Sequence, residues 1–207
     1  MRKIVKGNEP PVLSDWKRRN PNGQYQDLSH VERQTIRDSC LKEQYYLCAY
    51  CCQRIDGKNS HNEHIQTQQV APNQMLNFHN IVASCNKPKQ CGKAHRTEMI
   101  PLTPLMAECE TELEFNLSGR VKGLTQRANE SINLLNLGDD NKALVQTRKQ
   151  LVKTLIFMHR ESPEKLQLLD DDLLQILMEE ISQSQDGQLS DFAPILQNIL
   201  RQFLKQV

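Results

Sequence analysis

Two pairs of cysteines separated by thirty-three residues constrain this chain more than any other feature of its sequence. Cys48 and Cys51 form a CxxC knuckle, and Cys85 and Cys91 form a second pair with a five-residue spacer. The interval between the pairs exceeds the roughly 15–20 residues of a simple zinc ribbon, so it leaves room for functional sequence. Because four thiolates make a closed tetrahedral site, the pattern predicts a structural zinc ion that contributes to folding rather than to chemistry.

Disulfides, a redox CxxC or buried unpaired thiols are the alternative interpretations of these cysteines. The basic start of the chain, residues 1–7, is followed by no apolar segment, so we expect no secretory signal and a reducing, cytoplasmic location. Such a location disfavours disulfides, and a thioredoxin-like redox site would need a βαβ pattern that the sequence lacks. We expect Cys40, Cys52 and Cys109 to be packed thiols.

The chain has 207 residues, of which 38% are hydrophobic and 25% are charged. This composition is that of an ordinary globular domain. No run of eighteen apolar residues occurs, so no membrane span is expected. The net charge of +1 hides an asymmetry: residues 1–96 carry 15 Lys and Arg against 8 Asp and Glu, whereas residues 97–207 carry 11 against 17. The basic segment also holds most histidines and cysteines, which favours a polyanionic substrate such as nucleic acid.

The pattern along the chain divides it into a turn-rich arm, a cysteine-bearing module and a helical extension. Ser29 and Glu32 form a capping box, which predicts a helix from there to about Tyr46. We expect residues 7–24 to be extended, with one helical turn at Trp16. Short strands are expected at 62–65 and 78–84, a helix at 92–97, a hairpin at 115–122, and amphipathic helices from about 131 onward, one of them starting at Ser162 and Pro163. The expected domains are residues 1–28, 29–125 and 126–207.

Between the cysteine pairs lies the segment His61-Asn62-Glu63-His64-Ile65. On a strand, adjacent side chains diverge, so Glu63 can bind a divalent cation while His64 faces a water molecule. Hydrolysis of a phosphodiester needs a base near its natural pKa and a cation such as Mg²⁺ or Mn²⁺ to neutralise charge. The segment therefore predicts metal-dependent phosphodiester hydrolysis. A Cys–His hydrolase that uses Cys52 is the weaker alternative, because no third orienting group is placed by spacing.

In their order and spacing along the chain, these motifs resemble the HNH endonuclease superfamily. More narrowly, they resemble the PtuB-like HNH subunit of Septu and retron-associated antiphage systems. The resemblance spans most of the chain. It rests on residues 1–11, 43–51, 63–64, 77–81, 85–91, 101–104, 115–123 and 134–137. It implies a mainly α fold with a small ββα-metal (HNH) module, a zinc-stapled nuclease core and a C-terminal helical extension.

The resemblance also implies a role for each matched residue. His64 would be the general base, Glu63 a ligand of the catalytic Mg²⁺ or Mn²⁺, and Asn80 the residue that holds the loop and orients the His64 ring by a hydrogen bond. In many zinc-bearing HNH sequences a histidine directly follows the last cysteine, but this chain has Gly92 there. His95 would share a helix face with position 92, so it is the expected second metal ligand.

Other assignments stay open at this point. His61 could be a ligand instead of Glu63, His79 is expected as a strand residue or substrate contact, and Lys93 or Arg96 could contact phosphate. His30 and His159 are expected to be surface histidines.

The expected function is hydrolysis of nucleic acid, with DNA favoured over RNA, to products with 5′-phosphate and 3′-hydroxyl ends. The resemblance implies an antiphage role with a PtuA-like ATPase subunit as partner, and a retron reverse transcriptase with its msDNA as a further one. The alternative from another class is a non-catalytic, zinc-stapled module that binds nucleic acid or protein, which Gly92 in place of histidine would favour.

The acidic helical extension has two expected arrangements. Its helices could pack back on the nuclease core, or part of their surface could dock the ATPase. The final helix favours docking, because apolar residues cover much of its circumference, among them Leu200 and Phe203.

Overall fold

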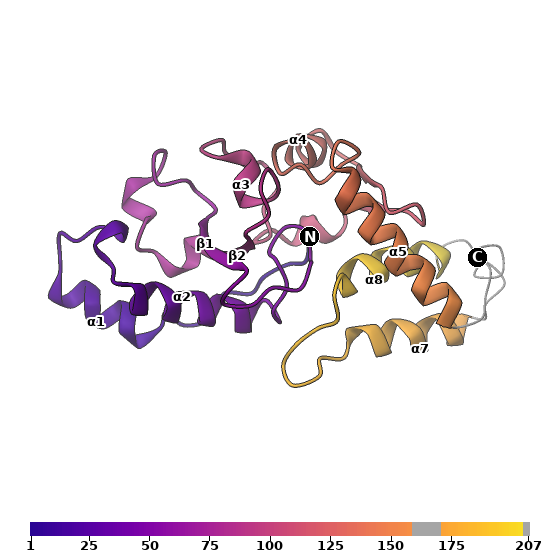
Figure 1. Cartoon of the computed structure of the whole chain (residues 1–207), viewed down its shortest axis with the longest axis horizontal. Coiled ribbons are helices and arrows are strands. Elements are labelled where there is room, and N and C mark those ends of the chain that lie inside the picture. Colours follow the sequence, from indigo (N-terminus) through magenta and orange to yellow (C-terminus); the bar gives the residue numbers. More distant parts are fainter. Residues whose placement is uncertain (159–170, 205–207) are drawn as a thin grey trace.

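The computed structural model describes residues 1–158 and 171–204 of the chain. The protein is rich in helices and contains two small sheets, each of two antiparallel strands (Figure 1). The elements are α1 (Pro11–Arg19), α2 (His30–Glu43), β1 (Ser60–His64), β2 (Ile81–Cys85), α3 (Gly92–His95), β3 (Leu113–Phe115), β4 (Val121–Gly123), α4 (Gln126–Leu134), α5 (Lys142–Met158), α7 (Asp171–Ser182) and α8 (Ala193–Leu204). Short 3₁₀ turns lie at Tyr25–Asp27, Pro72–Gln74, Phe78–Asn80 and Ala107–Glu110.

Helix α2 begins where the capping box predicts. The Ser29 hydroxyl accepts a hydrogen bond from the Glu32 amide, and the Glu32 carboxylate accepts one from the Ser29 amide at 2.6 Å. The helix ends at Glu43, three residues before the expected end, because Tyr45 and Tyr46 adopt left-handed backbone angles with φ of 52° and 59°. The chain then turns directly into the Cys48 knuckle.

The extended conformation expected for residues 7–24 is wrong between Pro11 and Arg19: these 9 residues form one helix, α1, which contains the single turn expected around Trp16. Pro11 stands at the start of the helix, where its missing N–H costs nothing, and Leu13 and Trp16 are buried on one face. Met1 and Ile4 are also buried in the main core, and the Ile4 amide donates to the Pro104 carbonyl at 2.7 Å. Burial of these apolar side chains holds the N-terminal residues against the rest of the molecule.

Strands β1 and β2 form a hairpin that carries the predicted catalytic segment. In their register Glu63 lies opposite Val82 and His64 opposite Ile81. All five residues of β2 are buried, and β2 packs on α2. Both strands and the short helix α3 lie within a few residues of the ranges that the sequence predicts.

The predicted hairpin near residue 118 is confirmed as β3 and β4, with Gly119 at its tip. Gly119 has a φ of +81°, and a Cβ atom there would lie 2.3 Å from the carbonyl oxygen of Val145 in α5. Only glycine allows the tip to approach the helix backbone so closely. The hairpin thereby fixes the position of α5.

The C-terminal helices pack on the same core. In α8, Ile195, Leu196, Ile199 and Leu200 are at most 6% exposed, and the Asn198 side chain bonds the backbone of β3. Just before α8, the Phe192 amide donates to the Cys52 carbonyl at 2.9 Å.

The expectation that Leu200 lies on a docking surface is therefore wrong. Leu200 is 1% exposed and packs against Leu174 and Leu177 of α7, because α7 and β3 cover the apolar faces of α8. Phe203 is only partly buried. His159 and the helix start expected at Ser162 and Pro163 lie outside the described residues. Among the described helices, none is both long and apolar enough to cross a membrane.

Candidate active site and metal centres

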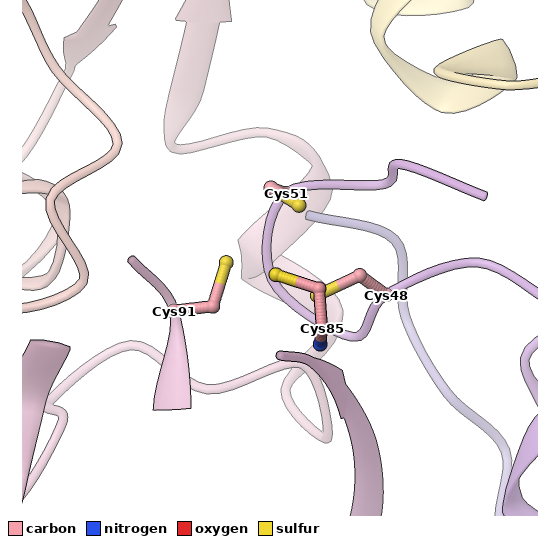
Figure 2. A group of neighbouring side chains, drawn as sticks. All are labelled: Cys48, Cys51, Cys85 and Cys91. Carbon is pink, nitrogen blue, oxygen red and sulfur yellow. The ribbon is translucent and has the colours of Figure 1, made fainter. Parts of the chain in front are cut away.

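The four predicted zinc ligands come together. Cys48 and Cys51 lie on the turn after α2, Cys85 ends β2, and Cys91 precedes α3. Their sulfur atoms all lie within 4.8 Å of one another, and the four residues are at most 3% exposed. Figure 2 shows the side chains converging from separate stretches of the chain. All seven cysteines, each within the described ranges, are free thiols, so the disulfide alternative is not the one observed.

The chemistry of this cluster fits a cation. Burial opposes ionisation of Cys48, but hydrogen bonds from Cys51, Cys85 and Cys91 outweigh it and hold the pKa of Cys48 well below its usual range. Burial raises the pKa of Cys51 and Cys91 well above that range. A hydrogen bond with Cys48 acts to raise the pKa of Cys85, as does burial, but hydrogen bonds from Cys51 and Cys91 outweigh both and lower it. Without a cation, Cys51 and Cys91 therefore keep their protons. A bound zinc ion is what allows four buried thiolates to coexist.

Arg148 of α5 lies beside these sulfur atoms and was not predicted from the sequence. It is 1% exposed, and its Nη1 donates to the Leu137 carbonyl at 2.8 Å, whereas Nε and Nη2 find no hydrogen-bond partner among the described residues. Burial lowers its pKa, and the neighbouring charges of Cys51 and Cys91 act in the opposite direction. A buried cation is costly without a counter-charge, and an anionic tetrathiolate supplies one.

The remaining buried thiols, Cys40, Cys52 and Cys109, lie outside the four-sulfur cluster, as expected. Burial raises the pKa of Cys40 and of Cys109 to about 12, which keeps both thiols protonated and unreactive at neutral pH.

Glu63 occupies the centre of a second cluster, next to the cysteine cluster along the hairpin. Its Oε1 lies 2.8 Å from Nε2 of His95, and its Oε2 lies 2.9 Å from Nε2 of His61. Burial acts to raise the pKa of Glu63, but hydrogen bonds from the two imidazoles lower it below its usual value. The structure thus brings together the predicted pair, Glu63 and His95, and adds His61 to it.

The place of His61 follows from strand geometry. Residues 61 and 63 point to the same face of β1 because side chains alternate along a strand. The sequence predicts His61 only as a substitute for Glu63, because the expected strand began at residue 62, whereas β1 begins at Ser60 and so includes both residues. The two-residue spacing is the signal that their side chains share a face once both lie in a strand. His61 is half-buried, and His95 is fully buried.

Gly92 makes this cluster possible. A Cβ atom at position 92 would lie 2.3 Å from Oε2 of Glu63 and 2.9 Å from Nε2 of His61. The Gly92 amide donates to the hydroxyl of Ser84 in β2 at 3.1 Å, which holds the start of α3 against the hairpin. Any side chain at this position would displace the carboxylate.

His64, the predicted base, points away from this face and is 7% exposed. Its Nε2 donates to the Met75 carbonyl at 2.9 Å, so Nδ1 carries the lone pair, and the exposed Gln68 amide contacts it at 3.2 Å. The Tyr25 ring packs edge-on against the imidazole, with 4.7 Å between ring centroids. Burial lowers the pKa of His64, which keeps the ring neutral and able to accept a proton.

Asn80 holds the loop that follows β1, as expected. Its Oδ1 accepts from the Gln66 amide at 2.7 Å, and its Nδ2 donates to the carbonyls of Gln66 and Gln74. The hydrogen bond expected between Asn80 and the His64 ring is not the one observed. Met75, one residue beyond Gln74, supplies the carbonyl that orients the ring, because the amide of Asn80 is already saturated by backbone groups.

The remaining candidates lie nearer the surface. Lys93 and Arg96 are exposed beside α3 and are free to meet an anion. His79 is exposed in a 3₁₀ turn rather than in a strand, and with Asn80 it lines a surface cavity of about 460 Å³. Glu63 and His64 do not line that cavity, so we place the candidate site at the hairpin on the grounds of its chemistry. His30 is exposed at the start of α2, as expected.

No family model matches the chain. The chain is similar to a protein of Escherichia coli named "Retron Ec83 putative HNH endonuclease", with 29% identity over 96 residues. The similarity covers 41% of this chain and 37% of the relative, so the chain matches little more than a third of the relative's length.

Proposed function

We propose that this protein is a metal-dependent endonuclease of the HNH type that hydrolyses phosphodiester bonds in nucleic acid. One observation carries the proposal: a hairpin followed by a short helix places the Glu63 carboxylate between two imidazoles, beside the buried histidine His64 and a four-cysteine cluster. These strands and α3 are the parts of a ββα-metal module. The name of the similar E. coli protein supports the same class of enzyme.

In this proposal Glu63 and His95 hold the catalytic divalent ion, Mg²⁺ or Mn²⁺. When bound, the ion would supply positive charge against the scissile phosphate and the leaving 3′ oxygen. Its donor set fits, because a carboxylate of lowered pKa and a buried imidazole converge within hydrogen-bonding distance of one another. Cys48, Cys51, Cys85 and Cys91 hold a structural zinc ion that stabilises the module.

His64 acts as the general base. Because Met75 fixes the proton on Nε2, Nδ1 is the nitrogen that accepts a proton from the attacking water. The exposed Gln68 side chain covers Nδ1, so it must move aside when substrate and water enter. Asn80 holds the loop whose Met75 carbonyl orients the imidazole. Attack on phosphorus with departure of the 3′ oxygen leaves 5′-phosphate and 3′-hydroxyl ends.

The substrate is a polyanion, and we favour DNA. The excess of 15 Lys and Arg over 8 Asp and Glu in residues 1–96 supports this, as do exposed Lys93 and Arg96 beside α3. Residues 29–125 form the nuclease module of the proposal, residues 1–28 an N-terminal segment and residues 126–207 a C-terminal region, of which helices α5 and α8 contribute buried side chains to the same core.

The test is a plasmid-nicking assay with metal add-back. Loosely bound ions are removed by dialysis, zinc content is followed by elemental analysis, and Mg²⁺ or Mn²⁺ is then restored. We expect nicking only after add-back, at constant zinc. DNA bound without being cut under any of these metals would instead support the non-catalytic, zinc-stapled binding module, the alternative that Gly92 favours by leaving no histidine after Cys91.

We further propose that the enzyme is the effector of an antiphage complex with a PtuA-like ATPase subunit. The retron in the name of the E. coli relative also favours a retron reverse transcriptase and its msDNA as partners. Co-expression with the products of neighbouring genes, followed by affinity purification, tests both: a stable complex that contains neither an ATPase nor a reverse transcriptase contradicts this assignment.

A further inference from the structure

The Nδ1 atoms of both imidazoles beside Glu63 are engaged by oxygen atoms that accept hydrogen bonds. For His95 the acceptor is the Glu98 backbone carbonyl, 2.9 Å from Nδ1. For His61 it is Oδ1 of Asn86, 3.0 Å from Nδ1. The orientation of the Asn86 amide follows from its other contact, since its Nδ2 donates to the Ser60 carbonyl at 3.0 Å. A carbonyl can only accept, so Oδ1 must face His61.

These contacts decide which ring nitrogen carries the lone pair. Without a cation, Nε2 of each ring donates to Glu63. Once a cation displaces that proton, the neutral imidazole still donates from Nδ1 and has its lone pair at Nε2. In His61 and in His95, Nε2 is therefore the atom suited to bind a cation, and in both it is the atom that faces Glu63. Metal-binding histidines characteristically donate their other N–H to a carbonyl or carboxylate in this way, which fixes the ring and the tautomer.

The spacing of each imidazole from Glu63 fits a pair of ligands on one ion. Each imidazole meets a different carboxylate oxygen, and among the described residues only the four cysteines have ligand atoms that all lie within 4.8 Å of one another, so a shared ion would draw both imidazoles toward it on binding. Two ligands about 2.1 Å from a metal and roughly at right angles to one another lie about 3 Å apart. The Glu63 oxygens lie 2.9 Å from Nε2 of His61 and 2.8 Å from Nε2 of His95. Position 92 cannot contribute a side chain, because its Cβ would lie 2.9 Å from the His61 Nε2 atom itself. His61 thus occupies the space that a residue directly after Cys91 would otherwise use.

We propose that His61 is a third protein ligand of the catalytic metal, so that the ion is held by two imidazoles and one carboxylate, with Asn86 as the positioning residue for His61. The inference rests on the proposed function, which assigns Glu63 and His95 to that ion. A ligand set of two imidazoles and one carboxylate also distinguishes Mn²⁺ from Mg²⁺. Imidazole ligands favour first-row transition ions such as Mn²⁺ over Mg²⁺, which prefers oxygen ligands. The site therefore binds Mn²⁺ more tightly than Mg²⁺.

The experiment measures Mn²⁺ binding to the full-length, zinc-loaded chain, by the loss of the electron paramagnetic resonance signal of free Mn²⁺, and Mg²⁺ binding by competition. The variants are His61→Ala, Glu63→Ala and His95→Ala, with His30→Ala as the control for an exposed histidine. Zinc content and melting temperature are recorded for each. We expect His61→Ala to weaken Mn²⁺ binding by about 10-fold or more at unchanged zinc content, and Asn86→Ala to weaken it by roughly 10-fold.

The outcomes separate this inference from the proposed function. If His61→Ala binds Mn²⁺ like the wild type while Glu63→Ala and His95→Ala do not, His61 is not a ligand and the proposed nuclease site stands. If all three variants bind Mn²⁺ like the wild type, the inference about His61 and the proposed catalytic metal site are both wrong. If His61→Ala loses its zinc or its fold, His61→Phe, which keeps a ring of similar shape but has no ligand atom, replaces it. Wild-type Mn²⁺ affinity in a folded His61→Phe overturns the inference.

Discussion

A Cβ atom on Gly92 would lie 2.3 Å from Oε2 of Glu63, closer than two such atoms can approach. Gly92 opens α3, where alanine would ordinarily be favoured over glycine. The absence of a side chain at this position is therefore a condition for the carboxylate to reach His61 and His95.

Gly92→Ala should accordingly abolish metal binding by Glu63 and reduce DNA nicking by roughly 10²-fold or more, because a small displacement of a positioned group is that costly in catalysis. Zinc content should stay at that of the wild type. Gly57→Ala is the matched control, since its Cβ would meet only the flexible end of Gln34. Wild-type nicking by a zinc-loaded Gly92→Ala protein would contradict the proposed position of the active site.

His64→Ala should reduce nicking by about 10²–10⁴-fold, the usual effect of removing a general base. Mn²⁺ affinity and zinc content should not change, because His64 bonds to Met75 and Gln68 rather than to Glu63. The rate comes from single-turnover nicking with His30→Ala as control. A His64→Ala protein that cuts at the wild-type rate would remove His64 from the mechanism.

Cys48→Ser should release the structural zinc and lower the melting temperature by roughly 10 °C or more, since zinc binding supplies folding free energy. Cys109→Ser, at a buried thiol outside the cluster, should keep one zinc ion per chain. Elemental analysis and thermal denaturation measure both effects. A stable, zinc-free Cys48→Ser protein that retains full activity would exclude the zinc interpretation.

Arg148→Met should accelerate zinc release to a chromogenic chelator by roughly 10-fold, because the buried guanidinium offsets the charge of the tetrathiolate. The sign of the stability change should depend on zinc. The variant should melt lower than the wild type when zinc is bound, and no lower when zinc is absent, since an uncompensated buried charge is then removed. Lys153→Met, exposed on the same helix, is the control. Equal destabilisation with and without zinc would show that Arg148 acts through packing alone.

Glu112→Gln should lower the melting temperature at pH 7 but not near pH 2. Hydrogen bonds from Arg127 and Thr125 hold the pKa of Glu112 at about 2, below its usual 4.5. A group whose pKa is depressed on folding stabilises the protein above its unfolded pKa, and this contribution is lost as the pH falls toward 2. Thermal melts across this range, with Glu180→Gln on the exposed face of α7 as control, measure it. A difference between Glu112→Gln and wild type that is independent of pH would exclude this ion pair as the cause.

Features with local causes could be predicted from the amino-acid sequence. The Ser29 and Glu32 capping box is a short-range exchange of hydrogen bonds, so it predicts the start of α2. The CxxC spacing and the second cysteine pair identify four sulfur ligands, because zinc chemistry requires that set wherever the chain brings it together. The resemblance to HNH sequences implied Glu63 and a ligand near position 92, and helical spacing then pointed to His95.

Contacts between segments far apart in the sequence could not be predicted, because they depend on how those segments pack in the folded protein. That His61 joins Glu63 rather than replaces it follows from β1 meeting α3 across Gly92. The tautomer of His64 depends on the Met75 carbonyl, which the folded loop brings to it. The amphipathic pattern of α8 could not distinguish an external partner from α7 and β3, because a buried face has the same sequence whichever surface covers it. Arg148 shows the same limit: a lone arginine in a helix is usually a surface charge, and only the fold shows that this one is buried near Cys51 and Cys91.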